Sequence, residues 1–271
     1  MTRATSLRRT AAAAPHIVWS VLFIVAPLLF VLYYAFTHQD GSFSLANIRD
    51  LFTADYLIIF LRSLCFAVIA TFICLVIAYP LAYCISRMKK HTQGVLILLI
   101  MLPMWMNLLI RTYCWMNLLE TNGLINTILG TNFTMLGTSG AVILGMVYNF
   151  LPYMVLPICT VMQKIDPSLL EAAGDLGCNS ILTTIKVVMP LSLSGVISGI
   201  TMVFVPSIST FYISQKMGGG SFDLIGDTIE RQFLTNNYNM GAALSLVLMV
   251  LVLLSMAVMN RFGDEEGGIV V

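Results

Sequence analysis

Three carboxylates near the C-terminal end of the chain have the spacing of neighbours on one side of a helix. Asp223, Asp227 and Glu230 follow the i, i+4, i+7 pattern. The apolar residues of the same predicted helix fall on a separate face that could pack on the rest of the protein: Phe222, Ile225, Ile229 and Phe233. Carboxylates at the entrance of a pathway would raise the local concentration of a cation. The alternative is a solvated face, partly neutralised by Lys216 and Arg231.

Four aromatic residues could add cation–π surfaces to such an entrance. They are Trp105, Tyr113, Phe211 and Tyr212. A cation over the face of an aromatic ring is attracted by the quadrupole of the ring. Packing, or a belt at the membrane interface, is the alternative for aromatic residues at these positions.

Arg111 is the one charge well within an apolar stretch, which covers residues 95–119. A charged residue inside a membrane span is by default a functional candidate. Counted from residue 95 at about 1.5 Å per residue, Arg111 would lie roughly 24 Å across the bilayer, close to the outer interface. There it could pair with another group or snorkel beside Trp105 and Trp115, or it could contact a substrate. An arginine would not bind a cationic substrate.

The segment 164–190 reads as two short helices joined by a bend. Asp166 is a good N-cap, and Pro167 suits the first helical position. Gly177 can take the left-handed conformation that ends a helix, and Asn179 or Ser180 can cap the second one. The apolar face of the first helix consists of Leu169, Leu170, Ala172, Ala173 and Leu176. Such an elbow is too polar to cross a bilayer and too apolar for an ordinary loop.

The same segment resembles the cytosolic signature of ABC importer permeases. That signature is Glu-Ala-Ala, three residues, Gly, nine residues and Ile-x-Leu-Pro. It is matched here by Glu171, Ala172, Ala173, Gly177, Val187, Met189 and Pro190, with Val and Met in place of Ile and Leu. The resemblance implies that the elbow, including Leu176, docks on a separate ATP-hydrolysing subunit. An interfacial amphipathic helix with no partner is the alternative.

The chain is not expected to be an enzyme. It has no GxxxxGKS/T phosphate loop, and the run Gly218-Gly219-Gly220 lacks the Lys-Ser or Lys-Thr that would have to follow. ATP and its magnesium ion are therefore expected on the partner ATP-binding subunit, present as a dimer. The six cysteines form no CxxC pair, so we expect small buried hydrophobes rather than a metal site.

Three further stretches resemble the permeases of spermidine/putrescine importers. They are residues 109–115, 204–220 and 224–233, which read LIRTYCW, FVPSISTFYISQKMGGG and LIGDTIERQF. The resemblance implies polyamine import by alternating access, a second permease chain and an extracytoplasmic polyamine-binding protein. Related permeases for ferric iron or sulfate keep another solute open as an alternative.

Composition places these residues in a membrane. Of the 271 residues, 58% are hydrophobic and 10% are charged, whereas a soluble domain carries about a quarter charged residues. About 20 apolar residues are needed for one span. We therefore predict an all-α, polytopic protein with six spans at residues 17–36, 64–85, 95–119, 141–161, 191–213 and 240–259. The resemblance implies the type I ABC importer permease (MetI-like) fold. The net charge of +1 indicates no preference for nucleic acid.

Positive charge gathers on one side of these spans. The lysines and arginines concerned are Arg3, Arg8, Arg9, Arg87, Lys89, Lys90, Lys164, Lys186 and Arg261. Loop 121–140 carries none, so the positive-inside rule places both termini in the cytosol. We expect a cytosolic tail at 1–16, a permease domain at 17–262 and a cytosolic tail at 263–271, in the inner or plasma membrane. A cleaved signal peptide fits less well, because the first apolar run is long enough to span.

Three prolines, Pro152, Pro157 and Pro206, are expected to interrupt spans and free backbone carbonyls. An ion-coupled secondary transporter is a further alternative, but it would need acids within the membrane. The predicted spans offer only Glu120 at an outer edge. A membrane scaffold without transport activity would leave the elbow signature unexplained.

Overall fold

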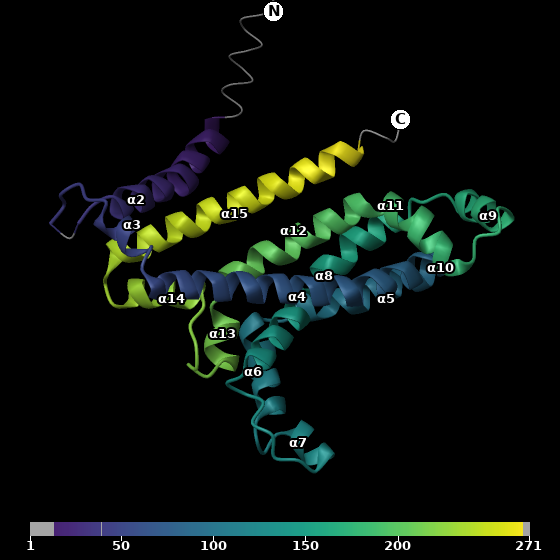
Figure 1. The fold of residues 1–271 in the computed structure, drawn as a ribbon, viewed down its shortest axis with the longest axis horizontal. Coiled ribbons are helices and arrows are strands. Elements are labelled where there is room, and N and C mark those ends of the chain that lie inside the picture. The colour runs from purple at the N-terminus through teal and green to yellow at the C-terminus, as the bar shows by residue number, and fades with distance from the viewer. Residues whose placement is uncertain (1–13, 39, 268–271) are drawn as a thin grey trace, which may run out of the picture. The chain divides into compact units, whose positions relative to one another are not determined.

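The computed structural model describes residues 14–38 and 40–267, and over these ranges the regular structure is helical. The predicted roles of Arg3, Arg8 and Arg9, and the end of the predicted C-terminal tail, lie outside the described residues. The elements after the first turns from Ala14 are η1 (a π-helix, Val21–Val25), α2 (Ala26–Ala35), α3 (Ala46–Asp50), α4 (Ala54–Ser86), α5 (Lys90–Trp105), α6 (Leu108–Leu119), α7 (Leu124–Leu129), α8 (Ser139–Met162), α9 (Pro167–Asp175), α10 (Ser180–Thr183), η2 (a π-helix, Thr184–Val188), α11 (Met189–Leu191), α12 (Leu193–Ser209), α13 (Tyr212–Met217), α14 (Ile225–Leu234) and α15 (Tyr238–Gly267). They are drawn in Figure 1. The all-α prediction is confirmed.

The chain divides into two compact units. The first consists of Met1–Leu57 and Thr228–Val250, and the second of Ile58–Asp227 and Leu251–Val271. The boundaries between the units fall within α4, α14 and α15, and each unit is described on its own below.

Four described helices are long and apolar enough to cross a membrane. They are Ala14–Ala35, Ala54–Ser86, Ser139–Met162 and Tyr238–Met259, and they contain the first, second, fourth and sixth predicted spans to within a residue. Two bent pairs bring the possible number to six: Lys90–Trp105 with Leu108–Leu129, and Ser180–Leu191 with Leu193–Ser209. The structure therefore agrees with up to six spans, by length and composition.

The predicted span at residues 95–119 is sharply bent rather than one straight helix. The two parts of this pair meet at 91°, and Figure 1 shows α6 turning away from the direction of α5. Pro103 lies in the last turn of α5, where it removes a backbone donor. Asn107 then caps α6, because its Oδ1 accepts the N–H of Leu109 at 2.8 Å. The depth counted for Arg111 along a straight helix does not hold.

The fifth predicted span is also interrupted. Helix α12 ends at Ser209, and α13 begins at Tyr212 after an extended Thr210. In contrast, Pro152, Pro157 and Pro206 do not break their helices, because α8 and α12 continue through them. Membrane helices tolerate a proline where neighbouring helices pack around the freed backbone groups.

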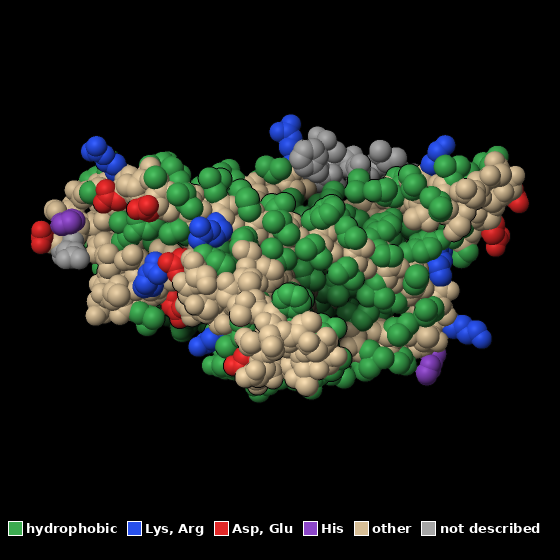
Figure 2. Space-filling view, turned by 60° about the horizontal axis from the view of Figure 1, so that its bottom comes forward, with side chains coloured by type: hydrophobic (Ala, Val, Ile, Leu, Met, Phe, Trp, Pro, Cys, Tyr) green, Lys and Arg blue, Asp and Glu red, His purple; other side chains and the backbone are tan. Residues whose placement is uncertain are grey.

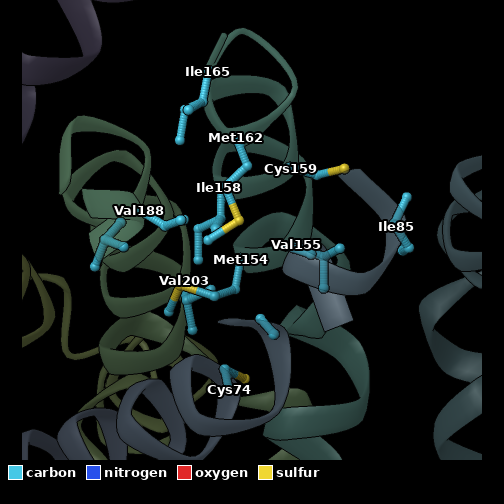
Figure 3. Close-up of a cluster of buried hydrophobic side chains, with 13 residues drawn as sticks. Cys74, Ile85, Met154, Val155, Ile158, Cys159, Met162, Ile165, Val188 and Val203 are labelled. Carbon is cyan, nitrogen blue, oxygen red and sulfur yellow. The ribbon is translucent and has the colours of Figure 1, made fainter. Parts of the chain in front are cut away.

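Helices α8 and α12 approach each other closely in the second unit. A Cβ atom added to Gly195 would lie 2.9 Å from the Pro157 carbonyl oxygen, and one added to Gly199 would lie 2.7 Å from Met154 Sδ. The two glycines stand four residues apart, the small-xxx-small spacing that lets membrane helices pack tightly. Around this seam lies the buried cluster of Figure 3, formed by Cys74, Ala78, Ala82, Ile85, Met154, Val155, Ile158, Cys159, Met162, Ile165, Val188, Val196 and Val203.

Two asparagines bind the C-terminal end of α2 in the first unit. Asn47 Nδ2 donates to the Thr37 carbonyl at 2.9 Å, and Asn239 Nδ2 donates to the same oxygen at 2.6 Å. Carbonyls at a helix end have no partner within the helix. The two amides therefore hold the start of α15 and the α3 segment to the end of α2.

Hydrophobic side chains cover much of the face drawn in Figure 2. Phe23, Phe30, Phe72 and Leu254 are examples of large apolar side chains that are mostly exposed. Soluble proteins rarely expose large contiguous apolar patches, whereas lipid accepts such a surface.

Candidate functional site

The elbow forms the bend that the sequence predicts. Asp166 Oδ1 accepts the backbone N–H of Ser168 at 2.9 Å and so caps α9. Hydrogen bonds from the Ser168 backbone and side chain lower the pKa of Asp166. At the other end, Gly177 has a φ of 80°. Its N–H donates to the Gly174 carbonyl, and the Cys178 N–H donates to the Ala173 carbonyl at 3.0 Å. These are the two bonds of a Schellman motif.

The second arm of the elbow starts at Asn179, as expected. Its Oδ1 accepts the N–H of Leu182 at 2.8 Å and caps α10. The arm continues through η2, where Val188 is buried in the cluster of Figure 3. Leu170 of the first arm packs against the same cluster. Both arms are therefore anchored to the core of the second unit.

The exposed residues of the elbow include large apolar side chains and three acids, Asp166, Glu171 and Asp175. Glu171 and Ala172 are exposed, whereas Ala173 is buried against the chain itself. Leu176 is 85% exposed and Ile181 is 70% exposed. Pro190, Gly177 and Leu169 are exposed as well. Of the residues predicted to dock on an ATP-binding subunit, Glu171, Ala172 and Leu176 are thus exposed and Ala173 is buried.

The three carboxylates do not share one solvated helical face. Asp223 precedes α14, which begins only at Ile225. Asp227 is 5% exposed: its Oδ1 accepts the Ser214 hydroxyl and its Oδ2 accepts the Leu224 N–H, both at 2.9 Å. A carboxylate that accepts the N-cap N–H stabilises the start of a helix. Asp227 therefore has a structural role at the start of α14. Glu230 is partly exposed further along α14.

The aromatic candidates fall into two groups. Tyr113 of α6 and Tyr212 of α13 pack edge to face, with ring centroids 6.4 Å apart. Lys216 Nζ lies 5.8 Å from the centroid of the first ring and 5.9 Å from that of the second. Trp105, at the end of α5, and Phe211, just before α13, are exposed.

From the sequence, Lys216 was expected only to neutralise nearby acids, whereas in the structure its ammonium lies over two aromatic rings. The spacing of Lys216 from Tyr212 could have indicated this contact, because side chains four residues apart in a helix lie on the same face. The position of Tyr113 against them depends on the bend between α5 and α6.

Arg111 is buried within the protein. It is 9% exposed, and its Nε and Nη1 atoms have no hydrogen-bond partner within the described structure. Asn149 Oδ1 of α8 is a third buried polar atom without a partner there.

Comparison with known proteins identifies relatives along nearly the whole chain. The family model described as binding-protein-dependent transport system inner membrane component matches residues 10–264. The spermidine/putrescine transport system permease protein PotB of Haemophilus influenzae is 37% identical over 256 residues, which cover 90% of each chain. PotB of Escherichia coli K12 is also 37% identical and covers 90% of this chain and 93% of its own.

Solved structures share the fold at low sequence identity. A bacterial ABC transporter involved in the import of the acidic polysaccharide alginate matches with a TM-score of 0.81 and 15% identity, over 97% of this chain and 96% of that chain. A bacterial alginate ABC transporter in complex with an alginate pentasaccharide-bound periplasmic protein matches with a TM-score of 0.82 and 14% identity, over the same shares.

Proposed function

The chain belongs to the binding-protein-dependent transport system inner membrane components, and we propose that it is the permease subunit of an ABC importer for polyamines. The observation that carries the proposal is the 37% identity to two PotB proteins over 90% of the chain. Those proteins are named for spermidine and putrescine transport. The bent helices and the elbow described above supply parts that such a permease needs.

Energy for transport comes from a partner in this proposal. An ATP-binding subunit, present as a dimer, holds ATP and magnesium and closes on binding them. The elbow, through Glu171, Ala172, Leu176, Gly177 and Pro190, carries that motion into the membrane helices. Its two rigid caps and its anchoring in the core support this role, because a motion applied to a fixed elbow moves the helices attached to it.

The remaining partners complete the pathway. A second permease subunit supplies the other half, since up to six helices enclose only one side of a route. An extracytoplasmic polyamine-binding protein delivers the solute. The chain lies in the inner membrane with several spans, both termini face the cytosol, and α13, α14 and the segment 121–140 lie on the outer side.

Candidate solute contacts are assigned to the outer side. Asp223 and Glu230 attract the cation electrostatically. Tyr113, Tyr212, Phe211 and Trp105 offer ring faces to it: a desolvated cation–π contact can contribute about 2 kcal/mol. Arg111 is not a cation ligand, because like charges repel.

Reconstitution with a solute panel tests the proposal. The complete importer is placed in proteoliposomes and offered putrescine, spermidine, ferric iron, sulfate and alginate oligosaccharide. ATP-dependent uptake of a polyamine that persists when an ionophore collapses ion gradients is the expected result. Uptake of another solute without polyamine uptake would assign the chain to the same importer class with a different cargo. Uptake that needs the ion gradient and no ATP would overturn the proposal.

A further inference from the structure

An ammonium group of the chain itself lies over two aromatic rings. Tyr113 and Tyr212 come from different helices, α6 and α13, and their rings pack edge to face with centroids 6.4 Å apart. Lys216 Nζ lies within 6 Å of both ring centroids, at 5.8 and 5.9 Å. Tyr113 is 47% exposed, and Tyr212 and Lys216 are partly exposed. The rings are therefore accessible from outside the chain as well.

The group that these rings hold has the chemistry of one end of a polyamine. A lysine side chain is a four-carbon chain with a terminal primary ammonium. A diamine such as putrescine presents the same primary ammonium on a chain of the same length. Rings that bind the lysine end can bind the free amine, but two ammonium groups repel each other at one site.

We propose that Tyr113 and Tyr212 form a subsite for a primary ammonium group and that Lys216 is its resident ligand. An incoming ammonium displaces Lys216 from the rings, so Lys216 weakens the binding of cations at this place. As a step in polyamine transport, this subsite rests on the proposed function. Its affinity for an ammonium can be measured without transport.

The probe is n-butylammonium, which copies the lysine side chain. Its binding is measured by calorimetric titration of the purified permease–ATPase complex, and its inhibition of polyamine uptake is measured in proteoliposomes. Lys216→Met empties the subsite, so we expect binding two- to fivefold tighter, the range that 0.5–1 kcal/mol for an exposed cation–π contact corresponds to. Lys216→Arg keeps a cation over the rings and should leave the affinity at the wild-type value.

Arg62 supplies a matched control for the loss of positive charge. Its Cζ lies 5.6 Å from the centroid of Phe222, so it makes the same kind of contact with a different ring. Arg62→Met removes the same charge from the same unit and should leave n-butylammonium affinity unchanged. Equal tightening in Arg62→Met and Lys216→Met would be a general electrostatic effect and would overturn the subsite.

The rings are tested in the Lys216→Met background. Adding Tyr113→Leu should remove the gain in affinity, whereas Tyr113→Phe should keep it, because the ring face remains. A gain that survives Tyr113→Leu contradicts the subsite, and so does unchanged binding in Lys216→Met. If wild-type proteoliposomes take up no polyamine, the proposed function fails, while the titration still decides whether the ammonium subsite exists.

Discussion

The Asp227 carboxylate accepts the hydroxyl of Ser214 at 2.9 Å, and this contact links α14 to α13. The other oxygen of Asp227 accepts the Leu224 N–H at the start of α14. One buried acid therefore fixes both the start of a helix and the helix before it. Because α13 carries Tyr212 and Lys216, this acid also positions the ammonium subsite.

Asp227→Asn should destabilise the protein by about 1–3 kcal/mol. An amide cannot accept both hydrogen bonds, and leaving a buried donor without a partner costs this much. Ser214→Ala should show a smaller loss, about 1 kcal/mol. Thermal unfolding of the purified chain in detergent measures both effects.

Ser209→Ala is the control for that series. The Ser209 hydroxyl is exposed, and among the described residues it bonds only to carbonyls of its own helix, at 3.1 and 3.4 Å. The melting temperature of the Ser209→Ala variant should match that of the wild type. A Ser214→Ala variant as stable as Ser209→Ala would contradict the structural role of Asp227.

Gly195→Val and Gly199→Val should each destabilise the second unit by 1 kcal/mol or more. The added Cβ meets the Pro157 carbonyl oxygen in one case and Met154 in the other, and overpacking of a tight core costs about 1–3 kcal/mol. Ser198→Val adds the same side chain to an exposed position of the same helix. Thermal unfolding should separate the two glycine variants from this control.

Local signals in the sequence predicted the elbow almost residue by residue. The N-caps Asp166 and Asn179 and the bend at Gly177 all depend on neighbours within four residues. Span positions were predicted nearly as well, because a bilayer imposes a length and an apolar composition. Helix α8 was also expected to break at Pro152, but tertiary packing allows it to continue.

Contacts between residues that are far apart in the sequence could not be predicted from local signals. The burial of Asp227 depends on Ser214, which lies 13 residues away, and helical spacing alone suggested a solvated face. Tyr113, which contacts Tyr212, lies in the helix that follows the 91° bend after α5. Pro103 and Asn107 were local signals of this bend, but the prediction was made from the apolar run alone.

A cysteine placed at Asn132 should be modified from outside the membrane. This residue is exposed and lies in the loop 130–138, which contains no Lys or Arg, and loops that lack positive charge face outward. Accessibility to a membrane-impermeant maleimide is measured in whole cells with a chain freed of its own cysteines. Labelling seen only in inverted vesicles would reverse the proposed orientation.

The double variant Asp223→Asn, Glu230→Gln should lower polyamine uptake modestly at low salt. Asp227 is left out because its loss would act through stability. Asp223 and Glu230 are partly exposed. Charges in contact with solvent are screened over about 8 Å at physiological ionic strength, so an effect caused by steering should fade as salt rises. Docking of the binding protein is measured separately, since the same side would contact it. Wild-type uptake at every ionic strength would leave both acids without a part in solute entry.

Gly177→Val should uncouple ATP hydrolysis from uptake. At a φ of 80° an L-residue costs about 1–2 kcal/mol, and a β-branched one is disfavoured further. The elbow would shift to relieve this strain, and Glu171→Lys would disturb the same surface by reversing its charge. The ratio of ATP hydrolysed to solute imported is measured in proteoliposomes and should rise in both variants, with assembly unchanged.

Two further substitutions distinguish loss of the left-handed bend from added side-chain bulk as the cause of uncoupling. Gly174→Ala adds a Cβ where nothing lies within 4 Å, inside the regular part of α9. Gly177→Asn adds a larger group at the bend, but asparagine tolerates the left-handed conformation. Both should stay close to wild-type coupling. If Gly177→Asn uncouples as strongly as Gly177→Val, bulk on the docking surface is the cause, and the left-handed bend is not what coupling requires.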